Sequence, residues 1–151
     1  DSSSHCLNQA MDITQPGWWN RLPLHKRDHK RPVFVVCEGV LMYLEPCKVR
    51  SIIREFAENA PEGSELILDF VSPLAVGPTA VLRHNEETGA PFTWGVHNGL
   101  EIAHLHPRLE LLSQHSVSEA YGLGASWADM YWGLLMGGPV YGLAHLRVTE
   151  P

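Results

Sequence analysis

The fold of this chain is decided by residues 33–46, which read VFVVCEGVLMYLEP. An apolar strand, expected over Val33 to Cys37, runs directly into a carboxylate, Glu38, and a glycine, Gly39. In open α/β sheets, ligands bind in the crevice beyond the carboxyl ends of the strands, and a glycine there permits a close approach of backbone to ligand. The pattern therefore indicates either a ligand-binding crevice or a buried strand that ends in an ordinary turn.

A helix is expected to follow this strand. Residues 45–46 open it, because proline is favoured at the first helical position, where its missing N–H would lack a partner anyway. Apolar residues then recur at helical spacing: Val49, Ile52, Ile53, Phe56, Ala57 and Ala60. The helix ends before Pro61, and Glu65 to Val71 (ELILDFV) is the next strand. Strand, helix and strand in about 40 residues form a right-handed βαβ unit, so the two strands should be parallel.

Outside this unit the pattern is weaker. A weak strand is expected over residues 6–13, followed by a turn at 14–17 and a short aromatic segment at 18–22. Beyond Ser72 the composition shifts toward proline, glycine and polar residues, which is typical of loops. The elements predicted there are short helices near 79–84 and within 94–106, a strand over 109–117, a glycine-interrupted helix within 120–136, and a final strand over 140–148.

The composition is that of one globular domain. With 151 residues, of which 44% are hydrophobic and 19% charged, the chain is able to bury a core. A net charge of −6 argues against nucleic acid and against an anionic membrane surface as partners, because both reward clustered Lys and Arg. No apolar run approaches the ~18–20 residues of a membrane span, and no signal peptide is recognised. We therefore expect a cytoplasmic protein.

Neither the cysteines nor the histidines predict a metal site. The three cysteines are odd in number and lack metal-ligand spacing, so we expect reduced, structural thiols. The best histidine trio, His97, His104 and His106, follows no known ligand pattern, and surface histidines are the better explanation. The G-x-G-x-x-G, G-x-x-x-x-G-K-[ST] and G-x-S-x-G motifs are also missing from the sequence, so at most half of a nucleotide-cofactor site is visible.

Four stretches of the sequence together resemble a known family. They are Asp12-Ile13, then Trp18-Trp19-x-x-Leu22, then VFVVCEGVLMYL at 33–44 and ELILDFVSP at 65–73. These residues are similar to those of the leucine carboxyl methyltransferase family, most closely to its bacterial branch that includes polyketide-synthesis O-methyltransferases. The stretch EGVLMYL (38–44) is the most recognisable motif of that family.

The resemblance implies an α/β, Rossmann-like class I methyltransferase fold. Such a fold is a mostly parallel, doubly wound sheet of seven strands, with one antiparallel strand near the C-terminus. Residues 1–151 would form a single domain that corresponds to its C-terminal part, strands three to seven. The first two strands, with the glycine-rich loop and the ribose-binding acid, would then be absent from this chain.

The resemblance also implies a cofactor, S-adenosylmethionine, and the residues that bind it. Asp12 with Ile13 matches the position near the adenine, although an aspartate before Gln-Pro-Gly also favours a plain turn. Glu38 and Gly39 match the motif that lines the methionine end, where a carboxylate suits a sulfonium and an ammonium. Asp69 and Ser72, after the fifth strand, border the same crevice.

Catalytic residues are not identified by the resemblance. The candidates are Tyr43, which either lines the acceptor pocket or packs in the core, and His97, a base for a hydroxyl acceptor. An aromatic stripe at 127–136 (Trp127, Tyr131, Trp132 and Met136) either covers an acceptor pocket or packs in the core or a dimer.

Two functions remain open on the sequence. The first is an S-adenosylmethionine-dependent O-methyltransferase that acts on a small-molecule carboxylate or hydroxyl, in polyketide or similar secondary metabolism. The second is a non-catalytic, incomplete domain that dimerises or binds a partner, because an exposed sheet edge invites pairing. The expected partners are a small-molecule acceptor, a second copy, or the missing N-terminal segment.

Overall fold

The computed structural model describes residues 8–24, 30–77, 90–117, 133–135 and 137–150. Its helices and strands are β1 (Phe34–Cys37), α1 (Pro46–Asn59), β2 (Glu65–Val71), α2 (Gly99–Ala103), β3 (Leu109–Ser116) and β4 (Tyr141–Val148). Short 3-10 turns lie at Trp19–Arg21 (η1), Leu41–Tyr43 (η3) and Pro73–Ala75 (η4). The strands expected over 33–37, 65–71, 109–117 and 140–148, and the helix expected from 45–46, are confirmed to within a residue or two.

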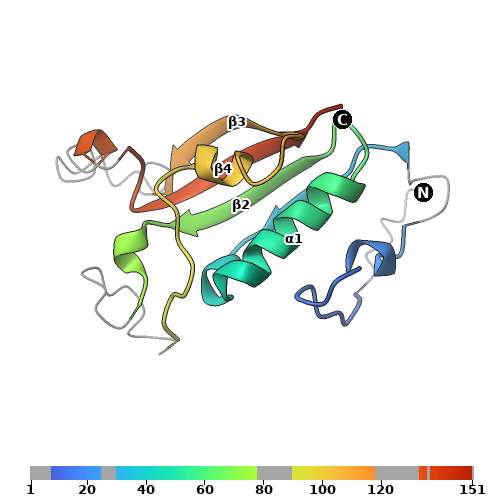
Figure 1. The fold of residues 1–151 in the computed structure, drawn as a ribbon, viewed down its shortest axis with the longest axis horizontal. Coiled ribbons are helices and arrows are strands. Elements are labelled where there is room, and N and C mark those ends of the chain that lie inside the picture. The colour runs from blue at the N-terminus through green and yellow to red at the C-terminus, as the bar shows by residue number, and fades with distance from the viewer. Residues whose placement is uncertain (1–7, 25–29, 78–89, 118–132, 136, 151) are drawn as a thin grey trace, which may run out of the picture.

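The strands form one sheet in the order β1-β2-β4-β3 (Figure 1). β1 and β2 are parallel, as the βαβ pattern predicts, and Val35 pairs with Leu66. β4 is antiparallel to both of its neighbours, β2 and β3, so β3 has the same direction as β1 and β2. The single antiparallel strand near the C-terminus, which the resemblance implies, is thus present.

The core lies between α1 and one face of the sheet. In Figure 1, α1 runs along the strands on that face. Its apolar stripe is buried in one cluster with the inward residues of β2 and β4: Val49, Ile53, Phe56, Leu66, Leu68, Phe70, Ala144, Leu146 and Val148. Burial of such side chains is worth about 1.5–3 kcal/mol each, so the helix and the sheet stabilise one another.

The other face of the sheet is apolar at β1 and largely open. Phe34 and Val36 are 60% and 59% exposed and pair with Glu65 and Ile67 on β2. The Phe34 ring meets the His145 ring of β4 edge-on, with centroids 6.3 Å apart, which places both on this face. In the described part of the chain, no strand pairs with the outer edge of β1.

One of the predicted elements differs from the structure within the described residues. The strand predicted over 6–13 is wrong for its described part, because residues 8–13 form no strand. A strand needs a neighbour to satisfy its backbone, and none of the described strands pairs with this segment. The segments 79–84 and 120–132, and the aromatic stripe at 127–136, lie outside the described residues.

The short helix expected within 94–106 is confirmed at Gly99–Ala103. The residues before it form no helix or strand. Trp94 and Val96 enter the core from these residues. The Trp94 and Val96 N–H groups donate to Met42 O and Val71 O, which competes with helix formation.

Arg108 joins the end of α1 to the end of β4. Its guanidinium donates to the carbonyl oxygens of Ala57 (2.9 Å), Glu58 (3.3 Å) and Ala60 (3.4 Å), and its Nε donates to Thr149 O at 2.9 Å. The last carbonyls of a helix have no partner within the helix, and a cation there also complements the helix dipole.

Replacing Arg108 with methionine is expected to lower the free energy of unfolding by about 2–3 kcal/mol, because several partly buried carbonyls lose a charged donor. Urea denaturation measures this change. Arg50→Met on the exposed side of α1 is the control, with an expected change within about 0.5 kcal/mol. Equal effects of the two substitutions would contradict the role of Arg108.

The Cys37 thiol, at the end of β1, is held in its neutral form. Burial raises its pKa from 9.0 to about 11, and the nearby Asp69 charge acts in the same direction. Because only the thiolate reacts with alkylating agents, we expect iodoacetamide to modify Cys37 at pH 7 roughly 100-fold more slowly than a thiol with a pKa of 9.0.

The measurement uses two variants in which Cys6 is serine, one that keeps only Cys37 and one that keeps only the exposed Cys47. Mass spectrometry follows the mass increase of each variant with time. Similar rates in the folded proteins would show that Cys37 is not protected.

Candidate functional site

The turn after β1 is held by a buried carboxylate. Gly39 has φ +67°, a conformation that favours glycine. Its N–H donates to both carboxylate oxygens of Asp69, at 3.1 and 2.9 Å. Asp69 is 1% exposed, and the Tyr141 hydroxyl donates to it at 2.5 Å. The ends of β1, β2 and β4 are therefore connected through one side chain.

Glu38 lies beside this turn and is exposed. None of the described residues forms a hydrogen bond or ion pair with its carboxylate. The structure thus brings Glu38, Gly39 and Asp69 together at the carboxyl ends of β1 and β2, where the sequence predicts a crevice. Asp69 turns inward to hold the backbone, whereas Glu38 presents a negative charge to solvent.

A second carboxylate fixes the aromatic segment against α1. Glu55 accepts the Gly17 N–H at 2.9 Å and the Trp19 N–H at 2.8 Å. Trp18, between them, is 7% exposed. Its ring meets that of Trp19 edge-on at 5.8 Å, and Trp19 meets Phe56 of α1 in the same way at 5.8 Å. The backbone of residues 17–19 therefore has a defined position over the helix.

An apolar cavity of about 170 Å³ lies between this segment, β1 and α1. Its walls are Ile13, Trp18, Val35, Val36, Cys37, Leu41, Ile52, Ile53, Phe56 and Leu66. Within the described residues, the Trp18 Nε1 is a buried polar atom without a hydrogen-bond partner. The cavity is able to hold a flat, largely apolar group.

Asp12 forms a turn in the structure. Its Oδ1 accepts the backbone N–H of Thr14 at 2.9 Å and the Thr14 hydroxyl at 2.7 Å, and its Oδ2 accepts from Gln15 at 3.3 Å. The side-chain hydrogen bond from Thr14, more than the other contacts, lowers the pKa of Asp12. The turn anticipated for Asp12 is confirmed, and it places the next residue, Ile13, on the cavity wall. An adenine contact of Asp12 stays a prediction.

Tyr43 belongs to a separate apolar cluster beyond the carboxyl ends of the strands. The cluster comprises Met42, Val71 and Ala75, with Tyr43, Val76, Phe92 and Tyr141 packed against them. The rings of Tyr43 and Phe92 are tilted by 49° with centroids 5.3 Å apart. Tyr43 is thus an aromatic wall residue on the crevice side of the sheet.

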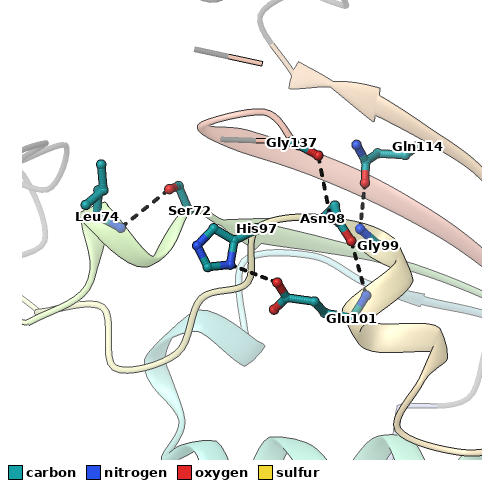
Figure 2. A network of polar contacts seen from close by, with 8 residues as sticks. All are labelled: Ser72, Leu74, His97, Asn98, Gly99, Glu101, Gln114 and Gly137. Carbon is teal, nitrogen blue, oxygen red and sulfur yellow. Dashed lines mark hydrogen bonds and ion pairs between the residues drawn. The ribbon is translucent and has the colours of Figure 1, made fainter. Parts of the chain in front are cut away.

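Ser72 is structural in this arrangement. It is buried, its N–H donates to Val140 O at 2.7 Å, and its hydroxyl accepts the Leu74 N–H at 3.4 Å. Ser72 therefore caps the short turn η4 (Figure 2) and secures the end of β2 to the chain before β4.

His97 is paired with a carboxylate on α2. Its Nδ1 lies 2.8 Å from Glu101 Oε1, and both side chains are roughly half exposed (Figure 2). Asn98 caps α2 by accepting the Glu101 N–H at 3.2 Å. The preceding residue, Val96, donates its N–H to Val71 O at the end of β2. A role of His97 as a base stays a prediction.

No metal site is formed within the ranges that the structure describes. They contain no group of three His, Cys, Asp or Glu side chains able to hold an ion, so His97, His104 and His106 do not make one. No helix in these ranges is long and apolar enough to cross a membrane.

Sequence reasoning did not identify Trp18, Glu55 and Tyr141 as site residues, and it named Trp18 only for the resemblance. Glu55 carries a usable signal, because an acid close to the apolar side of an amphipathic helix indicates a hydrogen-bonding partner. The positions of Tyr141 and Trp18 depend on distant parts of the chain.

Comparison with known proteins supports the resemblance. The leucine carboxyl methyltransferase family model matches residues 2–57. No curated protein matches the chain.

Among solved structures, a DUF574 family protein from Streptomyces avermitilis is 20% identical, with a TM-score of 0.56 over 91% of this chain and 53% of its own. The N-methyltransferase NodS from Bradyrhizobium japonicum, solved with S-adenosyl-L-homocysteine, is 20% identical, with a TM-score of 0.48 over 94% of this chain and 54% of its own. An O-methyltransferase family protein from Burkholderia thailandensis is 13% identical, with a TM-score of 0.41 over 82% of this chain and 33% of its own. The chain spans about half the length of the first two structures. The resemblance to the leucine carboxyl methyltransferase family is thus supported by the family model over residues 2–57. The chain shares its α/β fold with about half of the DUF574 family protein.

Proposed function

We propose that this chain is the C-terminal part of an S-adenosylmethionine-dependent O-methyltransferase. The observation that carries the proposal is that the range matched by the family model contains most residues of the apolar cavity. Nine of the ten residues that line the apolar cavity, all except Leu66, lie within residues 2–57, where the family model matches. The matched range therefore includes most of the cavity walls, several of which also belong to the hydrophobic core.

The residues present suit the cofactor. Ile13 and Trp18 line an apolar cavity of about 170 Å³, which suits a flat ring. Glu38, whose carboxylate has no partner among the described residues, lies at the carboxyl end of β1 and suits the positive methionine end. The φ of +67° at Gly39 exposes backbone there without a side chain. S-adenosylmethionine supplies an activated methyl group on a sulfonium sulfur.

The acceptor in this proposal is an oxygen of a small molecule. A carboxylate is already nucleophilic at neutral pH and needs no base from the protein. The chain would then act by orienting the reactants and excluding water, which is worth roughly 7–11 kcal/mol of the barrier. The cluster around Tyr43 and Phe92 provides an aromatic wall for such an acceptor. A hydroxyl acceptor would use a base, for which His97 is the weaker candidate, because its Nδ1 is paired with Glu101.

The polyketide branch of the family supports a place in secondary metabolism, and the free thiols of Cys37 and Cys47 agree with a cytoplasmic location. Both assignments belong to the proposal, as does the identity of the acceptor.

The partner in this proposal is the remaining part of the sheet. The outer edge of β1 is unpaired in the described part of the chain, and Phe34 and Val36 on its open face are more than half exposed. A further strand beside β1 would satisfy the backbone of this edge and cover both side chains. A preceding segment or a second copy would supply it.

The same open face favours one second candidate, a non-catalytic module that uses β1 only to bind a partner or to dimerise. Exposed Phe34 and Val36 fit either function, and only cofactor binding distinguishes the two.

The first test is calorimetric titration of S-adenosylhomocysteine into the 151-residue chain and into the longest natural polypeptide that contains it. We expect the longer polypeptide to bind more tightly, because additional strands complete the site beside β1. If the 151-residue chain binds as tightly as the longer polypeptide, the additional strands are unnecessary or are supplied by dimerisation. Absence of binding in both would reject the methyltransferase proposal and favour the binding module.

Asp69→Asn tests the support of the crevice. The substitution keeps the shape of the side chain but removes the charge that holds Gly39 and Tyr141, and charged hydrogen bonds are stronger than neutral ones. We expect the free energy of unfolding to fall by about 1–3 kcal/mol and S-adenosylhomocysteine to bind more weakly. Glu62→Gln, on the exposed turn before β2, is the control. Unchanged stability and affinity in Asp69→Asn would contradict the role given to Asp69.

A further inference from the structure

Residues 9–21 form a turn segment that is held together by its own hydrogen bonds. The Arg21 guanidinium donates to Asp12 O at 3.3 Å and to Gln15 O at 3.0 Å. The Gln9 side chain donates to Arg21 O at 2.9 Å. The Asp12 carboxylate accepts further hydrogen bonds within the same segment. The turn segment therefore has a defined internal structure, although η1 is the only regular element in it.

One side chain connects the turn segment to α1 through hydrogen bonds. Glu55 accepts the Gly17 N–H at its Oε2 (2.9 Å) and the Trp19 N–H at its Oε1 (2.8 Å). Among the described residues, no other hydrogen bond joins residues 9–21 to the rest of the chain. Trp18 and Trp19 are buried in the core, but apolar burial has no direction. The two hydrogen bonds to Glu55 therefore fix the position of the segment over the helix.

The turn segment also supplies part of the cavity wall. Ile13 and Trp18 line the cavity of about 170 Å³, together with Val35 of β1 and Ile53 of α1. Because Glu55 fixes the segment that carries Ile13 and Trp18, a shift of this segment changes the width of the cavity. A gap of about 0.5–1 Å already removes a quarter to a half of the dispersion attraction between facing atoms. The position of this wall therefore affects how well a flat ring is held.

We propose that Glu55 is a positioning residue for the cofactor. It holds Ile13 and Trp18 at the distance from β1 and α1 that the flat ring of the cofactor requires. This inference rests on the proposed function and adds a residue that acts through others, since Glu55 itself does not line the cavity. Its two carboxylate oxygens match two N–H donors. A glutamine offers an acceptor to only one of them, because its amide nitrogen is itself a donor.

The test compares Glu55→Gln with Glu58→Gln in the longest natural polypeptide that contains this chain. Glu58 lies about one turn further along α1, and its side chain is 58% exposed. Calorimetric titration of S-adenosylhomocysteine measures the affinities, and urea denaturation verifies that each variant is folded. We expect Glu55→Gln to weaken binding about tenfold, the value of one hydrogen bond to a charged group. Glu58→Gln should change the affinity by less than about twofold.

A second ligand distinguishes positioning from a purely structural role. 5′-Methylthioadenosine keeps the base, the ribose and the sulfur of S-adenosylhomocysteine but lacks its amino acid part. Glu55→Gln should weaken both ligands by the same factor, because the turn segment bounds the ring and not the charged end. A loss confined to S-adenosylhomocysteine would overturn the inference. So would unchanged affinity for both ligands in a folded Glu55→Gln variant, which is the result that a purely structural role predicts.

A third measurement needs no variant and decides the question if Glu55→Gln does not fold. Amide hydrogen exchange of the unmodified protein is followed with and without S-adenosylhomocysteine. At a ligand concentration ten times the Kd, the Gly17 and Trp19 amides should exchange about tenfold more slowly, because the ligand stabilises the closed wall. Unchanged exchange at both amides would overturn the inference.

The outcomes separate this inference from the proposed function. If the unmodified protein does not bind S-adenosylhomocysteine, the proposed function fails, and the role of Glu55 fails with it. If the unmodified protein binds and Glu55→Gln binds both ligands as tightly as Glu58→Gln, only the role of Glu55 is overturned.

Discussion

The structure depends on one buried charge, the carboxylate of Asp69 near the carboxyl end of β2. A carboxylate that is 1% exposed is tolerated only when its oxygens are hydrogen-bonded. Gly39 and Tyr141 provide those bonds from two different neighbours of β2. Asp69 thereby fixes the turn after β1 and the start of β4 relative to each other. The turn after β1 is thereby held at the carboxyl end of the sheet.

A second carboxylate, that of Glu55, also positions a segment by accepting hydrogen bonds from its backbone. Glu55 binds two backbone N–H groups of the segment 17–19, so the aromatic segment lies over α1 although it contains no helix or strand longer than η1. Asp69 and Glu55 hold two different segments: the turn after β1 and residues 17–19. Trp18, in the segment that Glu55 holds, lines the apolar cavity that the proposed cofactor would enter. Segments without regular structure are thus positioned by acids located on regular elements.

The helices and strands of this fold could be predicted from local sequence patterns, whereas several residues of the candidate site could not. The strand 65–71 and the helix from Pro46 were predictable because their periodicity and their end signals agree. Glu38 and Gly39 were predictable for the same reason, since strand ends are visible in the sequence. The position of Trp94 was not, because its N–H bonds to Met42, 52 positions away. Trp18 and Tyr141 depend on cavities and partners that only the assembled sheet creates.

The order of the strands also has a consequence for biosynthesis. β4 lies between β2 and β3, and β3 pairs with no other described strand. During translation, residues 109–116 therefore wait for residues 141–148 to leave the ribosome before they have a partner. Until then, only the βαβ unit is able to assemble, with its second strand open along one edge. Nascent chains in this interval present unpaired strand edges, the condition in which chaperones are most needed.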